Sequence, residues 1–324
     1  MIAQRKLIIT LETVTPMFLA GADPQKPELR APSFMGALRY WTRAALGGVL
    51  GDKNLEALKK AEEEVWGSTN GTGAVRIAVS HPDLSHKRIN PLPHKNSGTS
   101  FDGFNEDQKF QLTMTYTQGH EQAWEMGIAS LLFMLAHGGV GRRTRRGWGT
   151  LRIVNANLET SALNKDMGNL ILAPARMLAK QQIAPLNWYV YRTLVVNQAI
   201  ESAQQLCKKM GLKSVSQQKY PARFAIASLE EQEMVNVVVQ EPYQSGIDAI
   251  KAFGEIEHKF GAGQAFGSAN PRWASPLWVR VLPIKQPKTG YVLAMTILKS
   301  KSGIENYDRL EEFIGQWPLV EVKS

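Results

Sequence analysis

The sequence predicts an α+β protein built from two ferredoxin-like (RRM-like) domains, each with the order β-α-β-β-α-β, together with additional helices. Three observations lead to this prediction. Strand and helix patterns in the first half follow that order once. A helix, a glycine-rich loop with arginine and a strand occur at residues 120–157 and again at residues 247–284. The length of 324 residues suits two domains. We place the domains at residues 1–160 and 161–324.

Four segments of the first half are predicted strands. Residues 6–14 are rich in β-branched side chains, and residues 74–80 and 109–117 alternate between apolar and polar side chains. Residues 150–157 follow a glycine-rich stretch and complete the set. These four segments are the strands that one ferredoxin-like domain requires.

Helices are predicted between these strands. Ser33 is the predicted N-cap of the first helix, whose apolar side chains recur at intervals of three and four. A more acidic helix follows at residues 52–66. Residues 120–137 have the clearest helical pattern, and Gly138 ends it. We expect residues 81–104, which are polar and rich in proline and glycine, to form a long irregular loop.

The second half has a weaker pattern. We predict helices at residues 161–182 (interrupted by Pro174), 195–210, 247–260 and 306–316, and strands at residues 222–228, 234–241, 275–284 and 291–299.

Composition points to a polyanionic partner. The formal net charge is +9 and the isoelectric point is near 9.5, which favours nucleic acid. Cys207 is the only cysteine, so an intramolecular disulfide and a thiolate metal cluster are excluded. No signal peptide and no run of about 20 apolar residues is present, so we expect a cytoplasmic protein with no membrane contact.

The basic charge is concentrated at residues 138–152, which hold five glycines, five arginines, one tryptophan and no acidic residue. Glycine lets the backbone turn and approach a ligand closely, and arginine forks match phosphate oxygens. The stretch therefore predicts a cradle for a phosphate backbone, and a solvated basic surface loop is the alternative. The predicted contacts in this loop are Gly139, Gly141, Arg142, Arg143, Arg145, Arg146 and Trp148.

Other residues are expected to reach the same place. In a ferredoxin-like unit, the loops at residues 17–30 and 138–149 can flank one groove. Arg30 lies at the end of the first loop, and Arg39 and Arg43 share one helix face, where solvated charge is the alternative. The predicted faces for stacking on bases are Met17, Phe18 and Trp148, although Trp148 can instead anchor the loop to the core.

We find no catalytic constellation, metal-ligand set or cofactor motif. The histidines lack metal-ligand spacing, and neither GxxxxGK[ST] nor GxSxG occurs. A weaker alternative is that His86 or His94 acts as a general base on a ribose hydroxyl.

The glycine-rich stretch GGVGRRTRRGWG resembles that of the repeat-associated mysterious protein (RAMP) superfamily of CRISPR effector proteins. Five further stretches are similar to the first Cmr subunits of type III-B systems. These are residues 15–23 (TPMFLAGAD), 28–33 (ELRAPS), 36–44 (GALRYWTRA), 61–69 (AEEEVWGST) and 272–280 (RWASPLWVR).

This resemblance implies a non-catalytic RNA-binding subunit of a Cmr surveillance complex in antiviral defence. Its partners would be guide (cr)RNA near the 3′ region and other Cmr/RAMP subunits, with target RNA as a further candidate partner and with this chain capping one end. Arg39, Arg43 and the four loop arginines match the family's basic positions, whereas the second glycine-rich loop offers only Arg272. The alternatives are a RAMP-like metal-independent endoribonuclease that processes guide RNA, and a free-standing RNA-binding protein.

Overall fold

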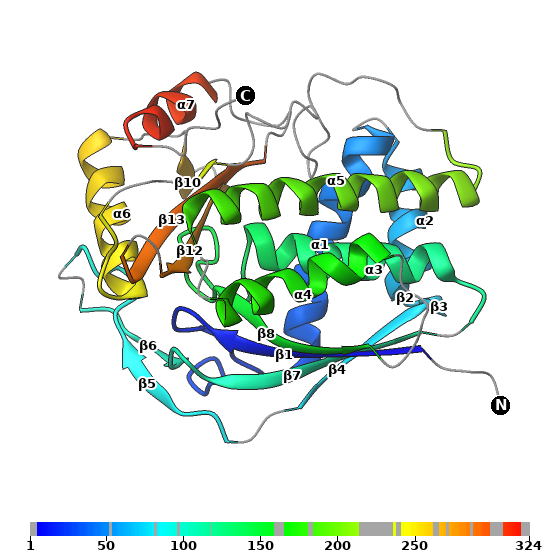
Figure 1. Ribbon diagram of the computed structural model, residues 1–324, viewed down its shortest axis with the longest axis horizontal. Coiled ribbons are helices and arrows are strands. Elements are labelled where there is room, and N and C mark those ends of the chain that lie inside the picture. Colours follow the sequence, from blue (N-terminus) through cyan, green and yellow to red (C-terminus); the bar gives the residue numbers. More distant parts are fainter. Residues whose placement is uncertain are drawn as a thin grey trace.

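A computed structural model shows a mixed helix and sheet protein, as predicted (Figure 1). It describes residues 5–51, 54–80, 83–95, 98–116, 118–158, 165–180, 184–213, 236–237, 241–261, 266–269, 272–285, 288–298 and 307–318. None of the helices in these segments is both long and apolar enough to cross a membrane.

The first sheet contains four antiparallel strands in the order β4-β7-β1-β8. They are β1 (Arg5–Thr13), β4 (Val75–Ser80), β7 (Lys109–Tyr116) and β8 (Leu151–Leu158). In chain order this is 2-3-1-4, the strand order of a β-α-β-β-α-β unit. All four strands coincide with predicted ones to within a few residues, because each buries alternate side chains against the helices.

Helices cover one face of this sheet (Figure 1). They are α1 (Ala31–Leu50), α2 (Leu55–Trp66), α3 (Glu121–His137), α4 (Lys165–Ala179) and α5 (Pro185–Lys209). The largely buried α3 packs against α1 and α5, which also contact each other. Residues on both sides of position 160 therefore share this helical layer.

A second sheet has the order β12-β13-β9, formed by β12 (Leu277–Ile284), β13 (Gly290–Ile297) and β9 (Asn236–Val237). It packs with α6 (Gly246–Phe260) and α7 (Tyr307–Gly315). The short strands β10 (Gly267–Ala269) and β11 (Arg272–Ala274) pair with each other. The strand predicted at residues 222–228 lies outside the described residues, so the second ferredoxin-like domain stays a prediction.

Three local predictions are wrong. The N-cap of α1 is Arg30, not Ser33, because Pro32 fits the first turn, where its missing N–H is not needed. Residues 81–104 are not wholly irregular, since β5 (His86–Ile89) and β6 (Phe101–Phe104) form a hairpin. The helix predicted to begin at residue 195 begins at Pro185. A further small hairpin joins β2 (Gly67–Ser68) and β3 (Gly71–Thr72).

Two hydrophobic clusters form the core, and each draws residues from both halves of the sequence. Trp278 and Ile284 of β12 join the cluster of β1, α1, α3 and α5. Phe18 and Trp148 join the cluster of α6, α7, β12 and β13. The domain boundary at residue 160 stays a prediction, and hydrophobic contacts cross it on both sides of the loop at residues 138–150.

A buried polar group connects α3 and α5 to the second sheet. His137 Nδ1 lies 2.8 Å from Thr296 Oγ1, and its Nε2 lies 3.2 Å from the Arg192 carbonyl oxygen. Burial, and next the charge of Arg192, lowers the pKa of His137 well below its ordinary value. The imidazole is therefore neutral, with Nε2–H donating to the carbonyl and Nδ1 accepting.

Candidate nucleic-acid interface

Residues 138–150, here called the Gly-Arg loop, leave the C-terminus of α3 and return into β8. Positive φ angles shape the loop, with 101° at Gly141 and 64° at Gly149. A Cβ atom would lie 2.4 Å from the Phe18 carbonyl oxygen at Gly141 and 2.0 Å from that of Val140 at Gly149. The glycines are therefore needed where the loop contacts the protein's own backbone.

Hydrogen bonds fasten the loop to the segment after β1. Gly149 N–H donates to the Pro16 carbonyl (3.0 Å), and Arg142 N–H donates to that of Phe18 (3.0 Å). Thr15 Oγ1 donates to the Gly147 carbonyl (2.7 Å) and accepts from Thr150 N–H (3.0 Å). These bonds fix both ends of the loop, whereas its tip at residues 141–143 is exposed, so the alternative of a solvated basic surface loop stays open.

Arg280 of β12 ties the two ends of the loop together. Its guanidinium donates to the Gly138 carbonyl at the end of α3 (3.3 Å) and to the Leu151 carbonyl at the start of β8. The side chain is buried, and burial lowers its pKa to about 10, so it stays charged at neutral pH. The negative end of the α3 dipole stabilises this cation. Val279 N–H also donates to the Arg145 carbonyl (3.2 Å).

The four loop arginines do not form one cradle. Arg142 is exposed, with its guanidinium 5.5 Å from the Phe101 ring centre. Arg145 lies over Trp278 (4.6 Å) and Tyr40 (5.6 Å).

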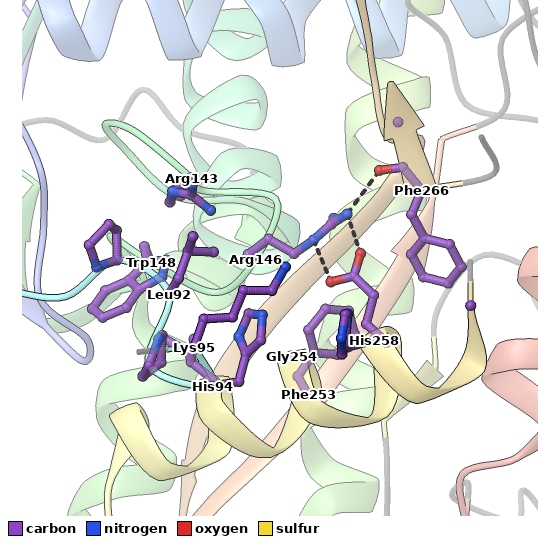
Figure 2. Close-up of a pocket in the computed structure, with 16 residues that line it drawn as sticks. Leu92, His94, Lys95, Arg143, Arg146, Trp148, Phe253, Gly254, His258 and Phe266 are labelled. Atoms are coloured by element: carbon purple, nitrogen blue, oxygen red, sulfur yellow. Dashed lines mark hydrogen bonds and ion pairs between the residues drawn. The ribbon is translucent and has the colours of Figure 1, made fainter. Parts of the chain in front are cut away.

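Arg146 is ion-paired rather than available for phosphate. Its Nη2 and Nε reach the two Glu257 oxygens at 2.7 and 3.0 Å, and its Nη2 also donates to the Phe266 carbonyl (Figure 2). Arg143 points into a different hollow, described below. The four arginines therefore do not share one phosphate site. Arg142 lines one hollow, and Arg143 and Arg146 line another.

The predicted groove is present between the segment after β1, the start of α1 and the Gly-Arg loop. We call it the α1 groove; its volume is about 400 Å³. Its lining residues are Phe18, Leu19, Ala20, Gly21, Pro32, Ser33, Gly36, Ala37, Tyr40, Trp41, Gly139, Gly141, Arg142, Thr144 and Trp278. Two loops distant in sequence thus flank one hollow, as their places in the topology predict.

Helix α1 presents bare backbone to this groove. Gly36 is an exposed helical residue, and a Cβ atom there would meet nothing within 4 Å. Neither steric crowding nor a positive φ angle accounts for a glycine at this position. The first turn of α1 holds no acidic residue, so the positive end of its dipole is not neutralised from within that turn.

A second hollow lies on the other side of the Gly-Arg loop and shares no lining residue with the α1 groove. We call it the α6 cavity; its volume is about 520 Å³. Figure 2 shows α6 along its floor and the side chains of Leu92, His94 and Lys95 beside it. The lining residues are Pro91, Leu92, Pro93, His94, Lys95, Arg143, Arg146, Trp148, Ile250, Phe253, Gly254, Glu257, His258, Gly261, Phe266 and Gly267.

Arg39 and Arg43 face α2, which contradicts their predicted place beside the groove. Arg39 donates to Glu62 Oε1 (2.7 Å) and to the carbonyls of Trp66 and Gly67. Arg43 donates to Glu62 Oε2 (2.9 Å). Both arginines therefore clamp α1 onto α2, because Glu62 offers them a half-enclosed carboxylate. Neither lines either hollow.

The predicted stacking faces are buried. Met17, Phe18 and Trp148 are 0%, 2% and 1% exposed. Phe18 packs on Trp148 with 4.9 Å between ring centres. These side chains anchor the loop to the core, so the stacking prediction is wrong for them in this conformation, and the alternative of Trp148 as a core anchor is correct.

Of the two remaining predicted contacts, Arg30 lines neither hollow. Arg30 is the N-cap residue of α1, with Nη1 4.0 Å from Glu28 Oε2. Arg272 belongs to β11, and its side chain lies outside the described part of the chain.

The two histidines considered as bases are separated. His86 lies on exposed β5 and lines neither hollow, whereas His94 lines the α6 cavity together with His258. In the described segments, no group of three His, Cys, Asp or Glu side chains could hold a metal ion.

Sequence reasoning missed Ser33, Tyr40 and Trp278 as groove residues, whereas the sequence already indicates close backbone approach by a neighbour or a ligand at Gly36. Tyr40 and Trp278 form a tilted pair with 5.2 Å between ring centres, and Arg145 lies over both rings. Tyr40 and Trp278 come together only because β12, in the second half of the chain, packs against α1, in the first half. The glycine at position 36 was a usable signal, since glycine is unfavourable inside a helix.

The chain is similar in sequence to proteins of one known family. A model of the RAMP superfamily matches residues 10–152. The chain is 31% identical over 178 residues to CRISPR system Cmr subunit Cmr1-2 of Pyrococcus furiosus, covering 45% of this chain and 94% of that protein. It is 34% identical over 146 residues to Cmr1-1 of the same organism, covering 41% and 43%.

Solved structures show the same fold over nearly the whole chain. Apo Cmr1 from Pyrococcus furiosus matches with a TM-score of 0.61 and 20% identity, covering 97% of this chain and 98% of that one. A chain of the type III-B Cmr-beta complex bound to cognate target RNA matches with a TM-score of 0.66 and 12% identity, covering 97% and 99%.

Proposed function

This chain belongs to the RAMP superfamily, and within it to the Cmr1 subunits, and on that premise we propose that it is a non-catalytic RNA-binding subunit of a type III-B Cmr complex. It binds guide RNA near the 3′ region through the α1 groove and caps one end of the assembly. We also infer that its second half is a second ferredoxin-like domain, supported by the β12–β13 pair and α6.

One observation carries the RNA-binding proposal: α1 exposes its backbone to the groove at Gly36. Glycine inside a helix costs about 0.5–1 kcal/mol relative to alanine. The open space around this position gives the folded chain no reason to require glycine. A ligand that approaches the helix closely does require it, and a sugar–phosphate backbone has the shape to do so.

The rest of the groove suits a single strand of RNA. The positive end of the α1 dipole and the Arg142 guanidinium attract phosphates. Tyr40, which is partly exposed, supplies aromatic surface for base stacking, which tolerates any sequence. Such recognition fits a guide RNA whose sequence varies from one complex to the next.

Substitution of Arg142→Gln tests the phosphate contact. We expect weaker binding of labelled single-stranded RNA and a slope of log affinity against log salt that is smaller by about 0.7 for each lost contact. Arg76→Gln is the matched control, because Arg76 is exposed on β4 and lines neither hollow. Equal affinities and slopes for the wild-type protein and both variants would refute the groove assignment.

Membership of a complex is tested separately. Co-expression with the other Cmr subunits and guide RNA should place this chain in one high-mass peak on size exclusion. Elution as a lone chain would favour a free-standing RNA-binding protein.

A rival function rests on the pair of histidines in the α6 cavity. His94 and His258 line it with Lys95, and these are side chains that can transfer protons and stabilise charge without a metal. We expect guide and target RNA to stay intact on incubation with or without Mg²⁺. Cleavage that disappears in a His94→Ala variant would instead establish a metal-independent endoribonuclease.

A further inference from the structure

The α6 cavity collects basic side chains that have no partner in the described part of the chain. The side chains of Lys95, Arg143 and His258 make no hydrogen bond or ion pair there. Among the lining residues, Glu257 is the only carboxylate, and Arg146 already neutralises it (Figure 2). The cavity is therefore positively charged overall, which favours an anionic ligand.

Arg143 adopts a backbone conformation that packing alone does not explain. Its φ angle is 60°, the left-handed region that non-glycine residues rarely occupy and that costs on the order of 1 kcal/mol or more. The side chain is exposed rather than held in the core. This conformation separates Arg143 from Arg142, which lines the α1 groove. The loop thus directs adjacent arginines to opposite hollows.

His94 also has a buried ring nitrogen, Nδ1, without a hydrogen-bond partner in the described residues. The ring packs so closely on α6 that a Cβ at position 254 would lie 2.1 Å from Nδ1, and Gly254 makes room for it. Burial, followed by the charges of Lys95, His258 and Arg143, lowers the pKa of His94, whereas Glu255 opposes them.

The rest of the lining is apolar and aromatic. Trp148, Ile250, Phe253 and Phe266 contribute to it, next to the cations. A volume of about 520 Å³ lies in the range of pockets that hold small molecules, which is roughly 300–1,000 Å³. Cations beside an aromatic and apolar surface match a ligand with both a phosphate and a base.

We propose that the α6 cavity is a second binding site, separate from the α1 groove, that takes one nucleotide. Lys95, Arg143 and His258 hold its phosphate, and its base lies against the partly exposed side chains of Leu92 and Pro93. The nucleotide comes either from an RNA strand, as one unit turned out of the stack, or from free nucleoside monophosphate. The proposal holds whether or not the α1 groove binds RNA.

Calorimetric titration of the full chain with adenosine 5′-monophosphate tests the free ligand. We expect binding that weakens at least tenfold in Lys95→Gln and in Arg143→Gly, and that is unchanged in Arg76→Gln, because Arg76 is exposed on β4 and lines neither hollow. Arg143→Gly also relieves the left-handed strain, so its melting temperature should rise, which separates lost binding from misfolding. Inorganic phosphate that binds as tightly as the nucleotide would overturn the nucleotide assignment.

Lysine footprinting tests the RNA source. Single-stranded RNA should protect Lys95 from acetylation in the wild-type protein, and Arg143→Gly should lose this protection. Protection without measurable mononucleotide binding identifies an RNA strand as the ligand. Absence of both overturns the proposal. Unchanged RNA affinity in Arg142→Gln would refute the assignment of the α1 groove. That result would not affect the conclusion drawn from the mononucleotide titration.

Discussion

Substitution of Gly36→Ala should make this protein more stable and a poorer binder of RNA. The added methyl group meets nothing within 4 Å, so it causes no clash in the folded chain. Alanine is favoured over glycine inside a helix by about 0.8–1.0 kcal/mol. We therefore expect the free energy of unfolding to rise by up to about 1 kcal/mol and the melting temperature by about 2 °C.

The same methyl group lies where the RNA backbone would approach α1. Loss of one close contact should weaken binding about tenfold, which corresponds to about 1.4 kcal/mol. The assay is fluorescence anisotropy of labelled single-stranded RNA at fixed salt, with urea unfolding of the same samples. Gly71→Ala is the matched control, because Gly71 is exposed, has equally open surroundings and lies outside the groove. A Gly36→Ala variant that is more stable yet binds RNA as tightly as wild type would refute the backbone contact.

Three further predictions concern the scaffold of the site. Arg280→Met should destabilise the fold by about 2–4 kcal/mol in urea unfolding, because two buried carbonyls lose their donor. A change below about 1 kcal/mol would show that Arg280 does not hold the two ends of the Gly-Arg loop together. His137 is neutral when folded and has an ordinary pKa of about 6.5 when unfolded, so stability should fall below pH 6.5 by about 1.4 kcal/mol per pH unit. His137→Gln should remove that part of the slope. Arg39→Gln should lower stability by about 1–2 kcal/mol yet leave RNA affinity unchanged, since its partners lie in and after α2; loss of RNA affinity in a folded variant would return Arg39 to the interface.

The first sheet could be predicted from the sequence because its strands carry their signal locally. Alternating side chains in β4 and β7 mark strands whose one face is buried, and the antiparallel order follows from the succession of elements. The hairpin of β5 and β6 was not predicted. Each strand has only four residues, and the prolines and glycines around them indicate an irregular loop more strongly than such short strands indicate a sheet. A strand that short has too few side chains to show a period.

Which arginines form ion pairs within the fold could not be predicted, because their partners are distant in the sequence. Glu257, which neutralises Arg146, is 111 positions away in the chain. Glu62 likewise removes Arg39 and Arg43 from the groove through the packing of α2 on α1. Composition identifies a basic segment, but only tertiary contacts decide which of its charges remain available to a ligand.

The glycines of this chain fall into two kinds, and the difference between them supports the proposed interface. Gly141 and Gly149 let the Gly-Arg loop pack on its own chain, since a Cβ at either would meet a backbone carbonyl. They explain the rigidity of the loop and not its ligand. Gly36 has open space on the groove side of α1, which supports the proposed close approach of a ligand. A rigid loop with Arg142 on one side and Arg143 on the other can hold two anionic ligands at a fixed separation. Binding measurements on Arg142→Gln and Arg143→Gly should therefore change independently, one for each hollow.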